Sequence, residues 1–237
     1  MRSLPLIAFV LGLFSMPPSA AAEGDLRVLF VGNSYSFQVP KVFAQIAKSK
    51  GKEVHVEQVT KGGWTLAKHA AAEATRTKIS GAEWDVVVLQ EQSQIPSFPD
   101  AQKRMGPAVE ALGGLAKDSG SKLVFFETWG RRDGDVRNRK GDTFAAMQKR
   151  LSAGYATAAK QGGGEVVPVG QVWASVKRDE LWSKDGSHPS KVGTYLAACV
   201  FYAALFGESP EGAGFVSGLE TGVAAGLQKA AGKVAKP

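Results

Sequence analysis

The chain has 237 residues and a formal net charge of +7 at pH 7, and its length suits a single α/β domain with a sizeable core. Its only cysteine, Cys199, excludes an internal disulfide, and the apolar residues around it predict a small buried hydrophobe. The positive charge would suit nucleic acid, an anionic wall polymer or an acidic saccharide. It is spread along the chain, however, and no nucleic-acid-binding motif is visible.

The first 22 residues have the pattern of a secretory signal peptide. A positively charged start and an apolar run over residues 4–14 precede the small-residue cleavage pattern Ala20-x-Ala22. The run is too short to cross a bilayer of about 30 Å, and no other segment is long and apolar enough to do so. We therefore expect an exported protein, periplasmic or secreted, that is not inserted in a membrane and folds as one domain over residues 23–237.

Strand-like and helix-like segments alternate along the rest of the chain. The predicted strands cover residues 26–31, 53–59, 85–89, 122–127 and 165–169. The predicted helices cover residues 39–50, 66–77, 100–116, 143–161, 190–206 and 216–233. The strictly alternating second strand is expected at a sheet edge. Helices between strands imply parallel pairing through right-handed crossovers. The expected fold is a flavodoxin-like three-layer α/β/α sandwich around a central, mostly parallel sheet of about five strands.

Polar, glycine-rich sequences follow the predicted strands, at the edge where ligands bind in such sheets. In chain order they are GNSYS (32–36), TKGGW (60–64), QEQSQ (90–94), TWGRRDGD (128–135) and, after GQVWASVK, DGSHPS (185–190). A functional site is therefore expected at this edge of the sheet.

Asp185 and His188 are three residues apart, a spacing that lies on one side of a helical turn. The carboxylate can hold the Nδ1–H of His188 and leave Nε2 as a general base. Ser34, after the first strand, can then give up its proton and attack an acyl carbon. His55 on the edge strand and His69 in an alanine-rich helix do not lie at a carboxyl end, which favours His188. The alternative is an Asp-Gly turn with an exposed histidine.

Serine attack also requires hydrogen-bond donors for the developing oxyanion. The candidates are the backbone N–H groups of Ser34 and Gly63 and the side-chain amide of Gln90 or Gln92. Gln90 is nearer the strand end. The alternatives are a tight turn at Gly62 and Gly63 and an ordinary polar loop for the glutamines.

These blocks resemble those of the SGNH/GDSL hydrolase superfamily. VGNSYS is similar to the first block, with GNS in place of the usual GDS, KGGW is similar to the second, and DGSHPSKVGTYLAA is similar to the last. The resemblance implies a triad of Ser34, His188 and Asp185, an oxyanion donor at Gly63 and no cofactor. The three histidines are far apart in sequence, which argues against a metal site.

The third block departs from the superfamily pattern Gly-x-Asn-Asp, in which the asparagine donates to the oxyanion. The chain has QEQSQ, closer to the Gln-Gly-Glu-Ser pattern of the sialate O-acetylesterase-like and plant carbohydrate esterase branches. This similarity gives the donor role to Gln90, and the missing glycine leaves Gln92 as the alternative.

The resemblance implies an exported serine esterase that removes short acyl groups, such as acetyl, from a saccharide. Candidates for the substrate rim are Asn33, Trp64, Trp129 and Arg131, although the tryptophans would equally suit core or rim packing. The basic segment 131–140 is interpreted as a solvated loop or as a rim that recognises anionic substrates. The alternatives are a non-catalytic exported glycan-binding protein and a lipid esterase or thioesterase of the same superfamily.

Overall fold

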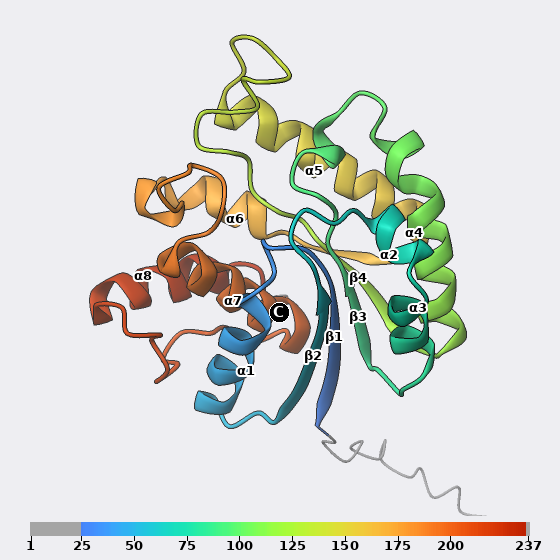
Figure 1. The fold of residues 1–237 in the computed structure, drawn as a ribbon. Helices are drawn as coiled ribbons and strands as arrows, with labels where there is room; N and C mark the ends of the chain where they lie inside the picture. Colours follow the sequence, from blue (N-terminus) through green and yellow to red (C-terminus); the bar gives the residue numbers. More distant parts are fainter. Residues whose placement is uncertain (1–24, 236–237) are drawn as a thin grey trace, which may run out of the picture.

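The computed structural model describes residues 25–235, so the signal-peptide prediction lies outside the described residues. A five-stranded, all-parallel sheet in the order β2-β1-β3-β4-β5 forms its centre (Figure 1). The strands are β1 (Leu26–Gly32), β2 (Val54–Thr60), β3 (Val86–Leu89), β4 (Lys122–Phe126) and β5 (Glu165–Val167). The strand order is the flavodoxin-like one, with β2 at an edge. The predicted fold class is confirmed.

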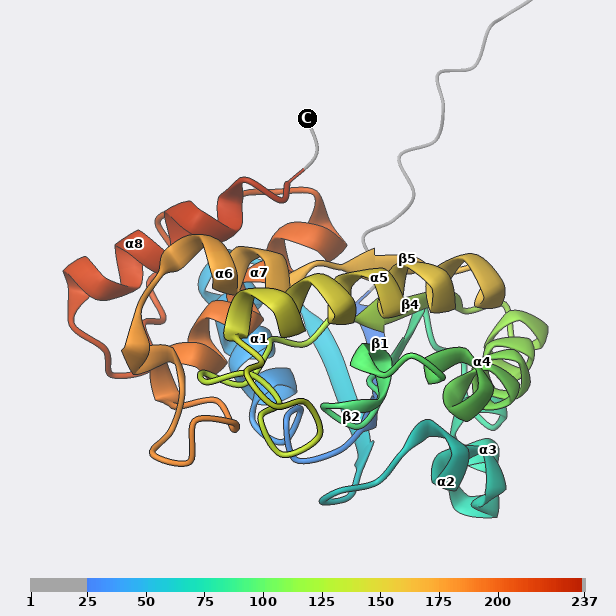
Figure 2. The same cartoon turned by 90° about the horizontal axis from the view of Figure 1, so that it is seen from above.

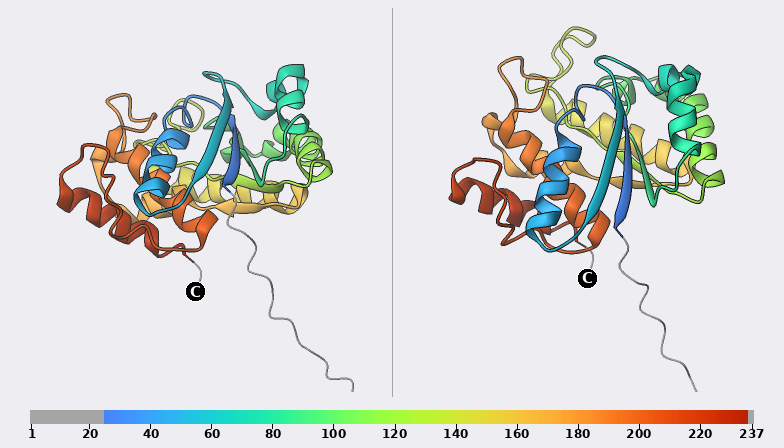
Figure 3. Two further views of the ribbon diagram at one scale, coloured as in Figure 1. Left: turned by 90° about the horizontal axis from the view of Figure 1, so that it is seen from below. Right: turned by 60° about the horizontal axis from the view of Figure 1, so that its bottom comes forward.

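Helices cover both faces of the sheet (Figures 1 and 2). One layer holds α1 (Val39–Ser49), α6 (Val169–Val176), α7 (Lys191–Phe206) and α8 (Thr221–Gly232). The opposite layer holds α2 (Leu66–Ala71), α3 (Glu73–Ser80), α4 (Ala101–Asp118) and α5 (Phe144–Gly162). Figure 3 shows α8 on the outer side of α7, away from the sheet. Two short 3₁₀ turns, η1 (Ile95–Ser97) and η2 (Asp179–Leu181), complete the fold.

The buried parts of the central strands are apolar because each is covered on both faces. In β1, Val28 and Phe30 pack against the α1 and α7 layer, whereas Leu29 and Val31 pack against the α2 to α5 layer. Alternate side chains of a strand point to opposite faces, so a strand between two helical layers has no polar side. Cys199 is fully buried in α7, as predicted.

Three predicted elements differ from the structure. The helix predicted over residues 66–77 is divided into α2 and α3, because Ala72 has an extended backbone with ψ of 116°. The fifth strand ends at Val167, two residues before the predicted end, and it is followed by α6, where no helix was predicted. The last helix begins at Thr221, five residues after the predicted start at Val216. Among residues 25–235, no helix has the length and hydrophobicity that a membrane crossing requires.

Candidate active site

Ser34 lies in the turn that follows β1, at the point where the strand order reverses. Open parallel sheets bind ligands at this position, between two strands whose connections run in opposite directions. Gly32 ends the strand, and a Cβ there would lie 2.6 Å from Gln90 Oε1, so only glycine fits. Ser34 is partly exposed, while Asn33 and Tyr35 on either side are buried. The turn therefore presents one hydroxyl to the surface.

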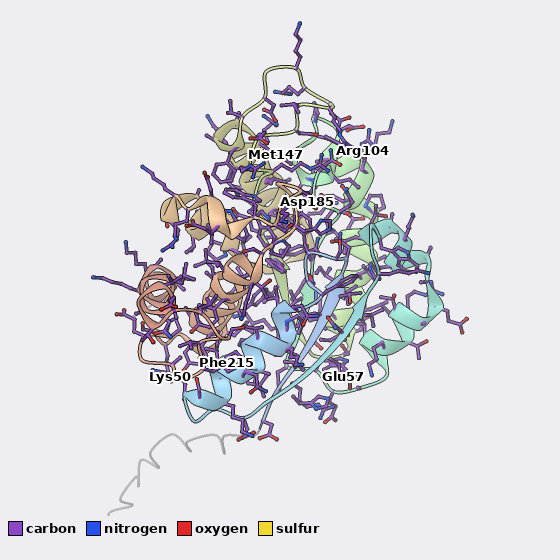
Figure 4. All side chains as sticks on the ribbon, turned by 60° about the vertical axis from the view of Figure 1, so that its left-hand side comes forward. Lys50, Glu57, Arg104, Met147, Asp185 and Phe215 are labelled. Atoms are coloured by element: carbon purple, nitrogen blue, oxygen red, sulfur yellow. The ribbon has the colours of Figure 1, made fainter. Side chains whose placement is uncertain are left out.

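The structure brings Ser34, His188 and Asp185 into one hydrogen-bonded row. Ser34 Oγ lies 2.9 Å from His188 Nε2, although the two residues are 154 positions apart. His188 Nδ1 lies 2.6 Å from Asp185 Oδ2. Asp185 is on the loop before α7, and Figure 4 shows it in the upper half of the molecule, on the side of the carboxyl ends of the strands. Two segments from opposite ends of the chain therefore meet at one site.

Asp185 is held as a carboxylate. Burial would raise its pKa, but hydrogen bonds from His188, Ser183 and the backbone N–H groups of Ser187 and His188 outweigh burial and hold the pKa well below its usual range. A charged carboxylate accepts the Nδ1–H of His188, which leaves the Nε2 lone pair facing the Ser34 hydroxyl. This tautomer is the one that a general base for serine requires.

An aromatic stack that the sequence did not reveal supports the Asp185–His188 loop. Tyr35 is hydrogen-bonded to Ser187 Oγ at 2.6 Å, and its ring packs edge-on against His188. Trp129 stacks on Tyr35 and on Trp173, and its Nε1–H donates to the Ser187 carbonyl at 3.0 Å. Trp129 is fully buried. Its prediction as a substrate rim residue is therefore wrong, because the side chain points into the core and anchors the loop.

Asn33 is also buried, with 2% of its surface exposed, so its prediction as a rim residue is wrong. Its Oδ1 accepts the N–H of Tyr35 at 3.1 Å, and its Nδ2 donates to the carbonyl of Trp64 at 3.1 Å. A longer contact of 3.5 Å reaches the Glu91 carbonyl. Asn33 therefore ties the loop after β1 to the loops after β2 and β3.

Two backbone donors are free at the site. Within residues 25–235, neither the N–H of Ser34 nor that of Gly63 has a hydrogen-bond partner. Gly63 is exposed and has φ of 68°, a left-handed conformation that favours glycine. The Asn33 bond to Trp64 holds its loop beside the loop of Ser34. These two N–H groups suit an oxyanion, and that role stays a prediction.

The burial of Gln90 contradicts its prediction as an oxyanion donor. The side chain is fully buried, its Oε1 accepts the N–H of Asn33 at 2.9 Å and the hydroxyl of Ser36 at 3.0 Å, and its Nε2 donates to the Glu91 carbonyl. Gln92 is partly exposed. Its Oε1 accepts the N–H of Gln94 at 2.9 Å, whereas its Nε2 makes only long contacts of 3.4 and 3.5 Å. Gln90 supports the nucleophile turn, and Gln92 is the glutamine whose NH₂ group is available to a ligand.

Replacement of each glutamine by alanine is expected to separate these roles. Gln90→Ala leaves the N–H of Asn33 and the hydroxyl of Ser36 buried without an acceptor, which costs roughly 2 to 4 kcal/mol of unfolding free energy. Gln92→Ala removes the acceptor of the Gln94 N–H, and it is expected to cost only about 1 kcal/mol of stability and to lower kcat roughly 10²-fold. Denaturant unfolding and ester kinetics on both variants make the comparison. A stable Gln90→Ala protein would contradict the supporting role.

Glu91, whose role the sequence left open, is fully buried at the same edge. Its Oε1 accepts the N–H groups of Leu66 at 3.1 Å and Gln92 at 2.6 Å, and its Oε2 has no partner within the described residues. Burial raises the pKa of Glu91 to about 7, against the opposing effect of these two hydrogen bonds. This carboxyl group fixes the start of α2 relative to the loop after β3.

The proton on Glu91 predicts a pH-dependent stability. The pKa of Glu91 rises from 4.5 to about 7 on folding, so the folded protein binds this proton more tightly than the unfolded chain does. The resulting contribution to the free energy of unfolding is complete below pH 4.5 and is lost as the pH rises through 7. The loss amounts to roughly 3 kcal/mol. Glu91→Gln keeps an acceptor at Oε1 and cannot ionise. Urea unfolding of both proteins at several pH values should show the variant gaining this amount relative to wild type as the pH rises, and a constant difference would contradict the assignment.

The other two histidines do not contact Ser34. His69 is fully buried, its Nε2–H donates to the Gly32 carbonyl at 2.8 Å, and its Nδ1 accepts the hydroxyl of Thr75 at 3.1 Å. Burial lowers the pKa of His69 and keeps it neutral. His55 is exposed on β2, 3.1 Å from Glu57. Their positions agree with the choice of His188 by elimination.

The remaining rim candidates, Trp64 and Arg131, are partly exposed. Trp64 follows Gly63, and Lys61 Nζ lies 4.7 Å from its ring centroid. Arg131 lines a pocket with His188. The basic segment 131–140 is more than a solvated loop, because buried Asp135 within it accepts a hydrogen bond from Gln94 at 2.8 Å.

No family model matches the chain, and no curated protein matches it. Solved structures are similar to it. A protein from Slackia heliotrinireducens, named as a candidate SGNH hydrolase, has 28% identity and a TM-score of 0.66, with 76% of this chain and 98% of that chain covered. The chain has the SGNH/GDSL hydrolase fold.

Two further structures share this fold at lower identity. A DUF4886 family protein from Bacteroides uniformis has 17% identity and a TM-score of 0.74, with 89% of this chain and 94% of that chain covered. A variant acetyl xylan esterase from Geobacillus stearothermophilus has 14% identity and a TM-score of 0.54, with 74% and 92% covered. Within residues 25–235 of this SGNH/GDSL fold, no group of three or more His, Cys, Asp and Glu side chains is arranged to hold a metal.

Proposed function

We propose that the protein is a serine esterase that hydrolyses carboxylic esters. The observation that carries the proposal is the row of contacts from Ser34 Oγ to His188 Nε2, 2.9 Å, and from His188 Nδ1 to Asp185 Oδ2, 2.6 Å. A nucleophile, a base and a group that orients the base in hydrogen-bond reach are the parts that acyl transfer needs. The similarity to SGNH/GDSL hydrolase structures supports the same reaction class.

The reaction proceeds through an acyl-enzyme. His188 takes the proton of the Ser34 hydroxyl, and Oγ attacks the ester carbonyl carbon. The N–H groups of Ser34 and Gly63 donate to the resulting oxyanion, with the Gln92 amide as a further donor. His188 then gives its proton to the leaving alcohol oxygen. Water, deprotonated by His188, attacks the acyl-Ser34 carbonyl and releases the carboxylic acid, which restores the serine.

The proposed substrate is a short acyl ester, such as an acetyl group, on a saccharide outside the cytoplasm. The signal-peptide pattern of residues 1–22 supports export, periplasmic or secreted. The name of the acetyl xylan esterase with the same fold supports an acetylated saccharide by analogy only. The Gln-containing third block supports the sialate O-acetylesterase-like or carbohydrate esterase-like branch.

A lipid esterase or thioesterase is the second candidate. Phe37, 40% exposed, follows the Ser34 turn and offers an apolar surface for a longer acyl chain. A lipase/acylhydrolase from Enterococcus faecalis shares the fold at 17% identity. A binding protein without activity would have no use for the hydrogen-bonded row at Ser34.

An acyl-chain series of para-nitrophenyl esters, with wild type and Ser34→Ala side by side, tests the proposal. We expect kcat/KM to be highest for the acetate and to fall for the butyrate and octanoate. A maximum at octanoate would favour the lipid esterase instead. If wild type and Ser34→Ala hydrolyse every ester at the same rate, the proposed function is wrong. Acetate release from acetylated polysaccharides then identifies the natural class of substrate.

A further inference from the structure

A pocket of about 340 Å³ opens directly beside His188. One wall is the loop of Asp185 to His188, and the other is the segment from Arg131 to Arg137, which Figure 1 shows in yellow-green at the top of the molecule. A molecule bound between these walls would contact the imidazole.

The position of the pocket assigns it to the alcohol part of an ester. In the proposed reaction, Ser34 keeps the acyl group and His188 protonates the leaving alcohol oxygen. The alcohol part therefore has to lie against His188 when the bond breaks. Because His188 lines this pocket and Ser34 does not, the pocket suits the group that leaves.

Two arginines give the pocket unused hydrogen-bond donors. Within residues 25–235, Arg131 Nε is buried without a hydrogen-bond partner, and Arg131 Nη1 lies 3.6 Å from Asp135 Oδ1. Asp135 takes closer hydrogen bonds from Gln94, at 2.8 Å, and from Asn138, at 3.0 and 3.1 Å. Within the described residues, the exposed guanidinium of Arg137 has no hydrogen-bond or ion-pair partner. Both side chains line the pocket, so a ligand there meets the unpaired guanidinium of Arg137 and, beside it, the guanidinium of Arg131, which is loosely paired with Asp135.

The two carboxylates of the pocket already have partners. Asp185 is already bonded to His188, to Ser183 and to two backbone N–H groups. Asp133 has a 74% exposed side chain that lies 3.6 Å from Arg132 Nη2. The formal charges of the lining cancel, so a ligand carboxylate would be bound by directed hydrogen bonds from the guanidinium groups rather than by the net charge of the pocket.

We propose that this pocket binds a carboxylate on the alcohol part of the substrate, so that the enzyme prefers esters of acidic saccharides. The inference rests on the proposed esterase function. The planar fork of a guanidinium matches a carboxylate with two parallel hydrogen bonds, which a neutral sugar cannot accept in the same way. Val136, with 53% of its surface exposed, adds an apolar contact for the body of the sugar.

Two esters that differ only in charge test this pocket. Para-acetoxybenzoate carries a carboxylate on its alcohol part, and para-acetoxybenzamide carries a neutral amide of the same shape. Wild type is expected to prefer the benzoate about tenfold in kcat/KM, mostly through KM. Arg137→Gln and Arg131→Gln should each remove most of this preference. Arg131→Lys should restore part of it.

Arg139→Gln is the matched control, since Arg139 lies in the same loop but does not line the pocket. It removes the same charge and should keep the full preference. Equal loss in Arg139→Gln and Arg137→Gln would mean a general field effect and would overturn the carboxylate site. Equal turnover of the two esters by wild type would also overturn it, while the esterase function would stand.

Calorimetric binding to Ser34→Ala protein keeps the test independent of turnover. Para-hydroxybenzoate, the alcohol product, should bind more tightly than para-hydroxybenzamide, and Arg137→Gln should remove the difference. This result would support the carboxylate pocket even if wild type hydrolysed neither ester. Absence of hydrolysis would contradict the proposed esterase function and leave the pocket assignment in place. Binding of both compounds with equal strength would overturn the pocket assignment.

Discussion

Ser34→Ala is expected to lower kcat on para-nitrophenyl acetate by roughly 10⁴-fold or more while the protein stays as stable as wild type. The hydroxyl is the group that attacks the ester in the proposed mechanism, and its contact at 2.9 Å is with His188. Ser34 is partly exposed, so removal of its oxygen leaves no buried donor or acceptor without a partner. Steady-state kinetics together with the thermal midpoint provide the measurement.

Ser36→Ala is the matched control for this experiment. Ser36 is two residues further along the same turn and is 1% exposed, and its hydroxyl donates to Gln90 Oε1 at 3.0 Å. Its loss should cost about 1 kcal/mol of stability and change kcat far less than Ser34→Ala does. Retention of activity within about tenfold in Ser34→Ala would remove this residue as nucleophile.

Asp185→Asn is expected to lower kcat by roughly 10³- to 10⁴-fold, although the side chain keeps its shape. Oδ1 of Asp185 already accepts from Ser183 and from the N–H groups of Ser187 and His188, so an asparagine would keep its carbonyl oxygen there. Its NH₂ group would then face His188 Nδ1 and force the proton onto Nε2. In that tautomer Nε2 cannot accept the proton of Ser34.

Asp133→Asn provides the comparison, because Asp133 is exposed in the pocket beside His188 and loses the same charge. We expect it to change kcat on the neutral acetate by less than about twofold. Similar losses of kcat in the two variants would indicate an effect of charge alone and would count against an orienting role for Asp185. Circular dichroism checks that both proteins are folded.

The sequence predicts the parts of the fold that repeat a simple pattern. The apolar runs of β1 and β3 indicate strands covered on both faces, and the alternation of β2 indicates an edge strand, as the sheet order shows. The order of strands and helices then fixes parallel pairing. This places the turn of Ser34 and the loop of His188 at one edge, and the two residues lie in contact there.

The sequence does not predict where a side chain points when its residue lies just beyond the end of a strand. Asn33, Gln90 and Trp129 all follow strand ends closely, yet all three point into the protein and hold loops together. A polar or aromatic residue at such a position can face a ligand or satisfy buried backbone groups, and its residue type is compatible with both. The contacts of neighbouring loops, which come from distant segments, decide between them.

The predicted helix boundaries were wrong for a similar reason, since contacts between distant segments determine them. No helix was predicted after β5, where α6 contains Gly170. This glycine lets α6 approach the loop after β4, since a Cβ there would lie 2.3 Å from the Thr128 carbonyl. No feature of the sequence marks the break between α2 and α3 at Ala72. The hydrogen bond that accompanies it joins His69 and Thr75 on either side of the break, and it forms only in the folded state.

The distance along the chain between Ser34 and His188 makes catalysis a late event in folding. A fragment that ends before the Asp185–His188 loop would contain the nucleophile and both backbone donors, and it would lack the base. Hydrolytic competence thus begins only when the loop before α7 has docked on the turn after β1. Turnover during refolding accordingly reports completion of the tertiary structure and should lag behind the appearance of helix.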